Sequence, residues 1–164
     1  MLRLDTGKLF AMQKQLDKRI EAEHGLTGSD LTEQKILALQ VELGELANET
    51  RCFKFWSVKP PSERSVILEE YVDGLHFILS LGLAFGYEVA EPVSVDVEEE
   101  LTACFLEVFE RVSDFRRQPE GDRFCKLFFT YMVLGEQLGF TSDDIHSAYE
   151  DKNQTNHERQ EQGY

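Results

Sequence analysis

The sequence predicts an all-α fold, arranged as one helical bundle over residues 1–164. Apolar residues recur at intervals of three and four along almost the whole chain, which is the spacing of one helix face. No segment longer than a few residues alternates with the period of a strand. The chain also shows no internal repeat and no linker, so we expect a single domain, as suits this length.

Six helices are predicted in order along the chain. Their approximate bounds are 5–23, 29–50, 62–85, 97–117, 122–139 and 141 into the polar tail. Gly25 and Gly86 are suitable stops for the first and third helices, and Ser62 is a suitable N-cap for the third. Between the second and third lies RCFKFWSVKPPSE, an aromatic and basic stretch whose proline pair excludes a helix. The turn PEGD separates the fourth and fifth helices, and Thr141 with Asp144 resembles a capping box that starts the last.

Composition limits the classes of function. The chain has 17 basic and 31 acidic residues and a formal charge of −14, which disfavours nucleic-acid binding but permits a small phosphate ligand held through divalent metal. No apolar run approaches the roughly 20 residues of a membrane span, and MLRLDTGKLFAMQKQLD becomes polar too soon for a signal peptide. The three cysteines are scattered and form no CxxC pair. We expect a cytoplasmic protein with no membrane partner.

Two predicted helices carry acidic side chains among apolar ones. In VELGELANE, Glu42, Glu45 and Glu49 fall within one narrow sector of the second helix, flanked by leucine and valine. In the third helix, Glu70 and Asp73 share a face, together with Glu69 and His76. Glutamate is rarely buried without a partner, so this pattern on two central helices requires an explanation.

A divalent metal explains the pattern best. Two carboxylates about 6 Å apart repel by roughly 3 kcal/mol at an effective dielectric constant near 20, and no lysine or arginine interleaves on the acidic face of the third helix. Carboxylates on facing helices are ligands that Mg²⁺ prefers, with water and substrate phosphates completing its shell. A single ExxE would more often be a solvated face, and His76 alone is more often a core histidine or a neighbour of the site than a ligand.

These motifs resemble a known superfamily. Glu42-Leu-Gly-Glu45 followed by Glu70-Tyr-Val-Asp73 is similar to the ExxE…ExxD signature of the all-α nucleoside triphosphate pyrophosphohydrolases, which include the MazG-like enzymes and the dimeric dUTPases. The segments FAMQKQLD, ELGELANETRCFKFW, EEYVDGLHF and YEDKNQTNHERQEQGY resemble the bacterial and phage form of the dimeric dUTPases. The resemblance runs from residue 10 to the end of the chain. The acidic signature is specific only to the superfamily, and the FKFWS and KxxxNxxRQ elements point to the dUTPases.

The resemblance implies Mg²⁺-dependent hydrolysis of dUTP to dUMP and pyrophosphate in a homodimer, with dUDP commonly accepted. It implies two or more metal ions per site, with Mn²⁺ as a substitute. Carried over by position, the metal-binding acids are Glu42, Glu45, Glu70 and Asp73. Glu49, one turn after Glu45, is a further candidate for a ligand or a neighbour of the ligands, and the residues alone add His76 to these candidates. Carried over in the same way, the substrate-binding residues are Gln13, Lys54, Trp56, Lys152, Asn156 and Arg159.

The chemistry of the residues agrees with this implication. Cleavage of a phosphoanhydride needs charge neutralisation, an in-line water molecule and a base. Glu45 is the expected group to orient or deprotonate that water, with Glu42 as the alternative. Lys152, Asn156 and Arg159 follow an i, i+4, i+7 rhythm that suits phosphate oxygens, so residues 149–164 are a candidate mobile lid. Gln13 could read the uracil edge, and Phe53, Phe55 or Trp56 could exclude a 2′-hydroxyl.

Two other functions fit parts of the sequence. A MazG-like or dCTP-type pyrophosphohydrolase of the same superfamily would share the metal-binding acids and differ in the base that it accepts. A helical bundle acting as a non-enzymatic interaction protein would carry the same acids for structural reasons, and removal of metal would leave its function unchanged.

Overall fold

A computed structural model shows the protein as a bundle of six helices and describes residues 2–88 and 92–163. The helices are α1 (Thr6–Glu23), α2 (Thr32–Thr50), α3 (Arg64–Phe85), α4 (Leu101–Arg117), α5 (Gly121–Gln137) and α6 (Ser142–Glu161). No strand occurs within the described residues. The all-α prediction is therefore confirmed. None of the helices in the described part of the chain is long and apolar enough to cross a membrane.

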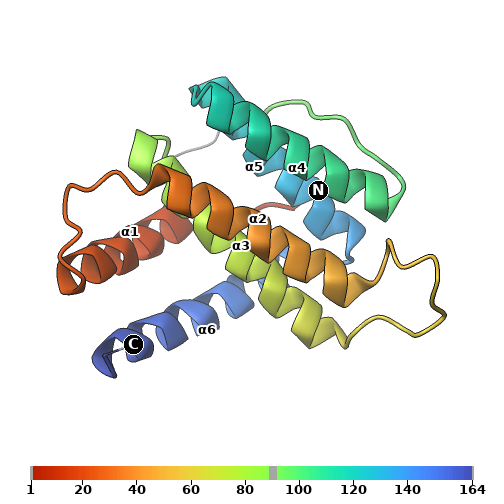
Figure 1. The fold of residues 1–164 in the computed structure, drawn as a ribbon, viewed down its shortest axis with the longest axis horizontal. Coiled ribbons are helices and arrows are strands. Elements are labelled where there is room, and N and C mark those ends of the chain that lie inside the picture. Colours follow the sequence, from red (N-terminus) through yellow and green to blue (C-terminus); the bar gives the residue numbers. More distant parts are fainter. Residues whose placement is uncertain (1, 89–91, 164) are drawn as a thin grey trace.

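Helix α3 is the centre of the bundle. It packs against α1, α2, α5 and α6, whereas α4 packs against α2 and α5. Figure 1 shows α2 lying across α3, with α4 and α5 on one side of this pair and α1 and α6 on the other. Ten residues of α3 are buried, eight of them in two unbroken runs at 74–76 and 78–82, because neighbouring helices cover it on several sides.

Two close helix contacts depend on glycine. A Cβ atom on Gly74 of α3 would lie 2.3 Å from the hydroxyl oxygen of Tyr131, and one on Gly135 of α5 would lie 2.5 Å from that of Tyr71. The absence of a side chain at both positions lets the two tyrosines cross between α3 and α5. The buried aromatic and aliphatic residues around them belong to one hydrophobic core that all six helices share.

The ends of the helices test the predicted caps. Thr141 and Asp144 form the predicted capping box at the start of α6, with both reciprocal hydrogen bonds present. Gly86 ends α3 in the left-handed conformation with φ of 79°, as predicted. The prediction for Ser62 is wrong, because Glu63 is the N-cap of α3 and makes no side-chain cap bond. Ser62 instead donates its hydroxyl hydrogen bond to the carboxylate of Glu49.

Two helices begin later than the sequence predicts. The second begins at Thr32 rather than near residue 29, and Asp30 accepts a hydrogen bond from the Thr32 backbone N–H ahead of it. The fourth begins at Leu101 rather than near Val97, with Glu100 as its N-cap. Residues 29–31 and 97–100, which the spacing of apolar side chains had assigned to these two helices, are non-helical.

Candidate active site

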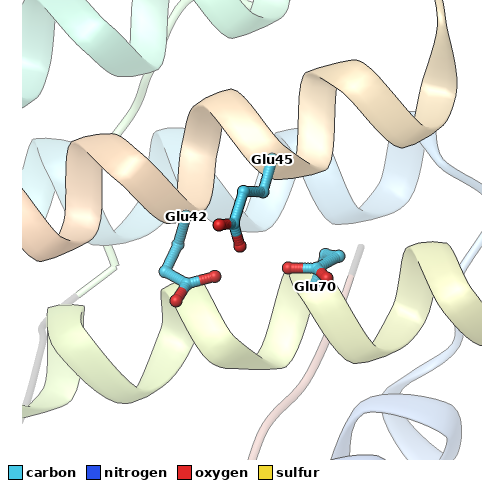
Figure 2. A group of neighbouring side chains, drawn as sticks. All are labelled: Glu42, Glu45 and Glu70. Carbon is cyan, nitrogen blue, oxygen red and sulfur yellow. The ribbon is translucent and has the colours of Figure 1, made fainter.

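Three glutamates converge between α2 and α3. One carboxylate oxygen from each of Glu42, Glu45 and Glu70 lies within 4.8 Å of the others. Glu42 and Glu45 are one turn apart on α2, and Glu70 faces them from α3, so that all three carboxylates point into the space between the helices (Figure 2). The sequence placed these acids on two central helices, and packing of α2 against α3 brings them together.

The electrostatics of this group are unfavourable without a cation. Burial, followed by the charge of Asp73, raises the pKa of Glu42 to about 8 and the pKa of Glu70 to about 7. The Oε2 atoms of both glutamates are buried and accept no hydrogen bond from the described residues. Several acceptor oxygens that face one another without donors fit a hard divalent cation. The residues present therefore suit the metal that the sequence implies.

Asp73, the fourth acid of the signature, lies beside this group and has its own partner. Its Oδ1 atom is 3.2 Å from the ammonium nitrogen of Lys152 on α6. The same ammonium lies 2.7 Å from Oε1 of Glu69. Burial raises the pKa of Asp73, and the charge of Lys152 opposes that shift. Asp73 thus connects the carboxylate group to the cationic face of α6.

Glu49 lies outside the carboxylate group. Its carboxylate accepts the hydrogen bond from Ser62, and its backbone carbonyl accepts from the Ser62 N–H at 3.0 Å. These two bonds join the last turn of α2 to the segment that enters α3. Glu49 therefore fixes the connection between the two acid-bearing helices in this structure.

Gln13 is the centre of a buried polar network between α1, α3 and α6. Its side chain is 3 % exposed. Its Oε1 atom accepts from the Tyr149 hydroxyl at 2.7 Å and lies 2.5 Å from Nδ1 of His76. Its Nε2 atom donates to Asp17 at 2.9 Å, and Asp17 also accepts from Ser80 at 2.8 Å. Since a carboxylate can only accept, this arrangement orients the amide and makes Nδ1 the nitrogen of His76 that carries hydrogen.

His76 lies in this network and not among the three converging glutamates. Burial lowers its pKa to about 3, so the imidazole is neutral at physiological pH. Its ring stacks on Tyr149 with centroids 4.4 Å apart. Its Nε2 atom is buried and has no hydrogen-bond partner among the described residues. His76 therefore presents an unused hydrogen-bond acceptor next to Gln13.

A cavity of about 220 Å³ adjoins the network and is lined by several of the candidate residues. Its walls include Gln13, His76, Phe77, Asn156 and Arg159. The structure thus brings together residues from the first motif, the third helix and the tail. A larger cavity of about 730 Å³ lies near the start of α2, but none of the site residues predicted from the sequence lines it, and its walls mix lysines with acids. We assign the smaller cavity to the site because of its residues rather than its size.

The tail of the chain is helical and docks on its neighbours. Lys152, Asn156 and Arg159 lie on α6, and Lys152 and Arg159 also line a groove of about 400 Å³ between α3 and α6. Arg159 therefore borders both the groove and the cavity. Polar contacts to α1 and its C-cap hold this helix, among them those from Lys8 to Glu150, from Arg19 to His157 and from His24 to Gln160.

Lys54 and Trp56 lie on the segment between α2 and α3, away from the carboxylate group. Trp56 is 64 % exposed and packs edge-on against Phe55 and Phe53. The Lys54 ammonium lies 5.8 Å from the centre of the Phe53 ring. Arg51 shapes the segment by donating to Ser57 and to the Lys59 carbonyl, with its own backbone at φ of 60°. Ser62 joins this segment to Glu49, but within the described residues neither Lys54 nor Trp56 makes a hydrogen bond or ion pair with another candidate.

Sequence reasoning missed three members of the polar network. Asp17, Ser80 and Tyr149 are remote in the chain, and each is a single polar residue on a helix that is otherwise interpreted by its apolar face. One signal was present, because Asp17 and Ser80 interrupt the apolar spacing of α1 and α3 on the faces that meet. Asp17 also lies one turn after Gln13 on α1, whereas only the packing of the helices identifies Ser80 and Tyr149 as partners in the network.

The fold and the site define a class of protein: an all-α bundle in which carboxylates from two adjacent helices converge beside a helix that carries Lys152 and Arg159, and beside a small polar cavity. A family model described as dUTPase matches residues 5–164. The chain belongs to this all-α dUTPase family and is a dUTP diphosphatase. The family match decides in favour of this enzyme over the MazG-like, dCTP-type and non-enzymatic alternatives. A search of curated proteins found no match.

Proposed function

We propose that this dUTP diphosphatase works with Mg²⁺ held by Glu42, Glu45, Glu70 and Asp73, and that it also converts dUDP to dUMP and phosphate. The observation that carries the proposal is the convergence of three carboxylates within 4.8 Å, two of them with buried oxygens that lack donors. We expect two or more ions per site, with Mn²⁺ as a substitute. When bound, such ions neutralise phosphate charge and make coordinated water more acidic.

Glu45 is our choice for the residue that orients or deprotonates the attacking water. It is the exposed member of the three, whereas Glu42 and Glu70 are half-buried. A general base must lie within hydrogen-bond reach of the water whose proton it takes, and an exposed carboxylate at the edge of the group is accessible to such a water. Glu42 remains the alternative, since its carboxylate is in the same group.

The cationic face of α6 suits the phosphates. Lys152 and Arg159 line the groove between α3 and α6, and Asn156 with Arg159 borders the cavity. Arginine can bind two phosphate oxygens at once, and lysine supplies a compact charge. We propose that residues 149–164 tighten over the substrate as a lid when the phosphates bind.

The cavity suits the base. The Gln13 network fixes its polar wall, and the unused acceptor of His76 matches the N3–H donor of uracil, which cytosine lacks. Phe77 lines the same cavity and is an aromatic side chain that could exclude a 2′-hydroxyl. It is a better placed candidate for that role than Phe53, Phe55 or Trp56, which lie on the exposed segment.

We further propose a homodimer. Several large apolar side chains are exposed on one chain, which is unusual for an isolated domain when they gather in patches. They are Leu37, Val41, Phe55, Trp56, Val58 and Leu106. Sedimentation at several concentrations would test the dimer. A cytoplasmic location is our expectation from the three free cysteines, and we expect no nucleic-acid partner, because the chain carries a charge of −14.

The experiment that tests the proposal is pyrophosphate and phosphate release from dUTP, dUDP, dTTP, dCTP and UTP, with Mg²⁺ and with excess chelator. Chelator-sensitive turnover of dUTP and dUDP, with the other nucleotides spared, would support both the metal and the cavity. Turnover of dUTP that survives the chelator would remove the metal from the proposal. Equal turnover of dCTP would remove our assignment of the cavity.

A further inference from the structure

Lys152 joins two acids that have different surroundings. Its ammonium lies 2.7 Å from Oε1 of Glu69 and 3.2 Å from Oδ1 of Asp73. The Lys152 side chain is 11 % exposed, that of Asp73 is 22 % exposed and that of Glu69 is 60 % exposed. One cation thus bridges an acid of the signature to an acid at the surface, one turn earlier on α3.

The position of this ammonium resembles that of a counter-ion for the acidic site. Asp73 lies one turn after Glu70 on α3, and its charge raises the pKa of both Glu42 and Glu70, so it acts on the same group of carboxylates. Its own charge is offset by Lys152. A divalent ion that binds Asp73 would compete with the ammonium for the same carboxylate, because like charges repel at short range.

We propose that the Lys152 ammonium pairs with Asp73 when no metal is bound. We propose further that Glu69 is a positioning residue, which holds this ammonium in place once a metal ion binds Asp73. The inference rests on the proposed metal site. An ammonium has three donors, so Lys152 can hold Glu69 while its contact to Asp73 is lost. The ammonium then stays in the groove between α3 and α6, where the proposed phosphate contacts lie. Glu69 has no other role in the site described above.

The mechanism predicts effects of opposite sign from the two partners. Lys152 bridges Glu69 and Asp73, so removal of the Glu69 charge should leave Asp73 as the remaining partner of these two. Metal binding should then weaken, because the ammonium competes for Asp73. Removal of the Lys152 charge should strengthen metal binding in the absence of nucleotide, because the ammonium then no longer competes for Asp73. Loss of any negative charge near the site would also weaken metal binding, and loss of any positive charge would strengthen it. A double-mutant cycle is therefore needed to show that Glu69 acts through Lys152.

Calorimetric titration of the metal-free protein with Mn²⁺, without nucleotide, measures these effects. We expect Glu69→Gln to raise the Kd about threefold to tenfold in the natural chain and less than about twofold in a Lys152→Met background. Asp151→Asn is the matched control. Asp151 is exposed and lies in the same groove, and the substitution removes one negative charge, as Glu69→Gln does. We expect it to change the Kd by less than about twofold. Circular dichroism checks folding, and Lys152→Gln is the second background if methionine at 152 disrupts the fold.

An equal Glu69→Gln shift in both backgrounds would overturn the inference, because Glu69 would then act by its charge alone. A shift of the same size from Asp151→Asn would overturn it for the same reason. No Mn²⁺ binding by the natural chain would instead overturn the proposed metal site itself. The two failures are therefore distinct.

Discussion

Tyr71 and Tyr131 hold α3 and α5 together through a reciprocal pair of hydrogen bonds. The Tyr71 hydroxyl donates to the backbone carbonyl of Tyr131 at 2.9 Å, and the Tyr131 hydroxyl donates to that of Tyr71 at 2.5 Å. Their rings are stacked with centroids 4.5 Å apart, and both residues are fully buried. Tyr71 follows Glu70 directly, so this pair lies immediately behind the carboxylate group.

The first prediction concerns this pair. Tyr131→Phe should lower the free energy of unfolding by about 1 to 2 kcal/mol, since it removes one buried hydrogen bond. Gly135→Ala should lower it by about 1 to 3 kcal/mol or more, because the new methyl group would meet the Tyr71 hydroxyl. Urea denaturation measures both. Tyr87→Phe is the control, since its hydroxyl donates to Pro119 at an exposed site, and an equally large loss there would contradict the prediction.

The second prediction is a dependence of stability on pH. The ordinary pKa of a glutamate is 4.5, whereas burial and neighbouring acids place Glu42 near 8 and Glu70 near 7 in the folded protein. Between these values the folded state binds more protons than the unfolded state, so the stability of the metal-free protein should fall as pH rises from about 5 to about 8. Denaturation at pH 5.5 and pH 8.5 measures this change.

A divalent metal should reverse that trend, because it binds the ionised carboxylates. The rise in Tm caused by Mg²⁺ should be larger at pH 8.5 than at pH 5.5. Glu42→Gln should flatten the pH dependence of the metal-free protein. A Tm that responds to metal equally at both pH values would contradict the assignment of these glutamates as ligands.

The third prediction distinguishes the effect of Glu45 on catalysis from its effect on protein stability. Glu45→Gln should lower kcat by about 10²-fold to 10⁴-fold, the usual range for a group that activates water. It should not lower the free energy of unfolding of the metal-free protein, because Glu45 is exposed and its charge lies close to two other carboxylates. Steady-state kinetics with dUTP and denaturation measure the two effects. A kcat close to that of the natural enzyme would move the role to Glu42.

The fourth prediction tests the proposed lid. Limited proteolysis should cut within residues 149–164 more slowly when a non-hydrolysable dUTP analogue and metal are present, because Lys152, Asn156 and Arg159 would hold the phosphates. Arg159→Ala should abolish most of this protection. Cleavage at an unchanged rate would indicate that the tail keeps one conformation throughout.

The fifth prediction concerns Trp56, which the resemblance places beside the substrate and the structure places at the surface. Trp56→Ala should change stability by less than about 0.5 kcal/mol, as expected for an exposed residue. An increase in KM at unchanged sedimentation would assign Trp56 to the substrate, whereas a lighter sedimenting species would assign it to the dimer. No change in either would leave it without a role in this enzyme.

The sequence predicted what depends on local spacing. The capping box of Thr141 and Asp144 involves residues three apart, and the sector of Glu42 and Glu45 involves one turn, so both follow from helix geometry alone. Ser62 is not the cap because α3 starts one residue later, with Glu63 as its N-cap, and the Ser62 hydroxyl instead donates to Glu49, on the preceding helix. The same limit applies to Asp73, whose contact with Lys152 joins residues 79 positions apart. Gln13 was assigned to the base by resemblance. Its partner Asp17 lies one turn later on α1, but His76 and Tyr149 could be found as partners only after α1, α3 and α6 were packed together.

The two halves of the site differ in how far apart their residues lie in the chain. The three converging glutamates come from α2 and α3, which are consecutive helices, whereas the cavity needs Gln13 near one end and Arg159 near the other. Contacts between distant residues form late in folding, because closing a long loop costs more entropy. We therefore expect a growing or partly unfolded chain to gather its acids before it has any means of choosing a nucleotide. Selectivity would be the last property gained during synthesis and the first lost when α6 detaches.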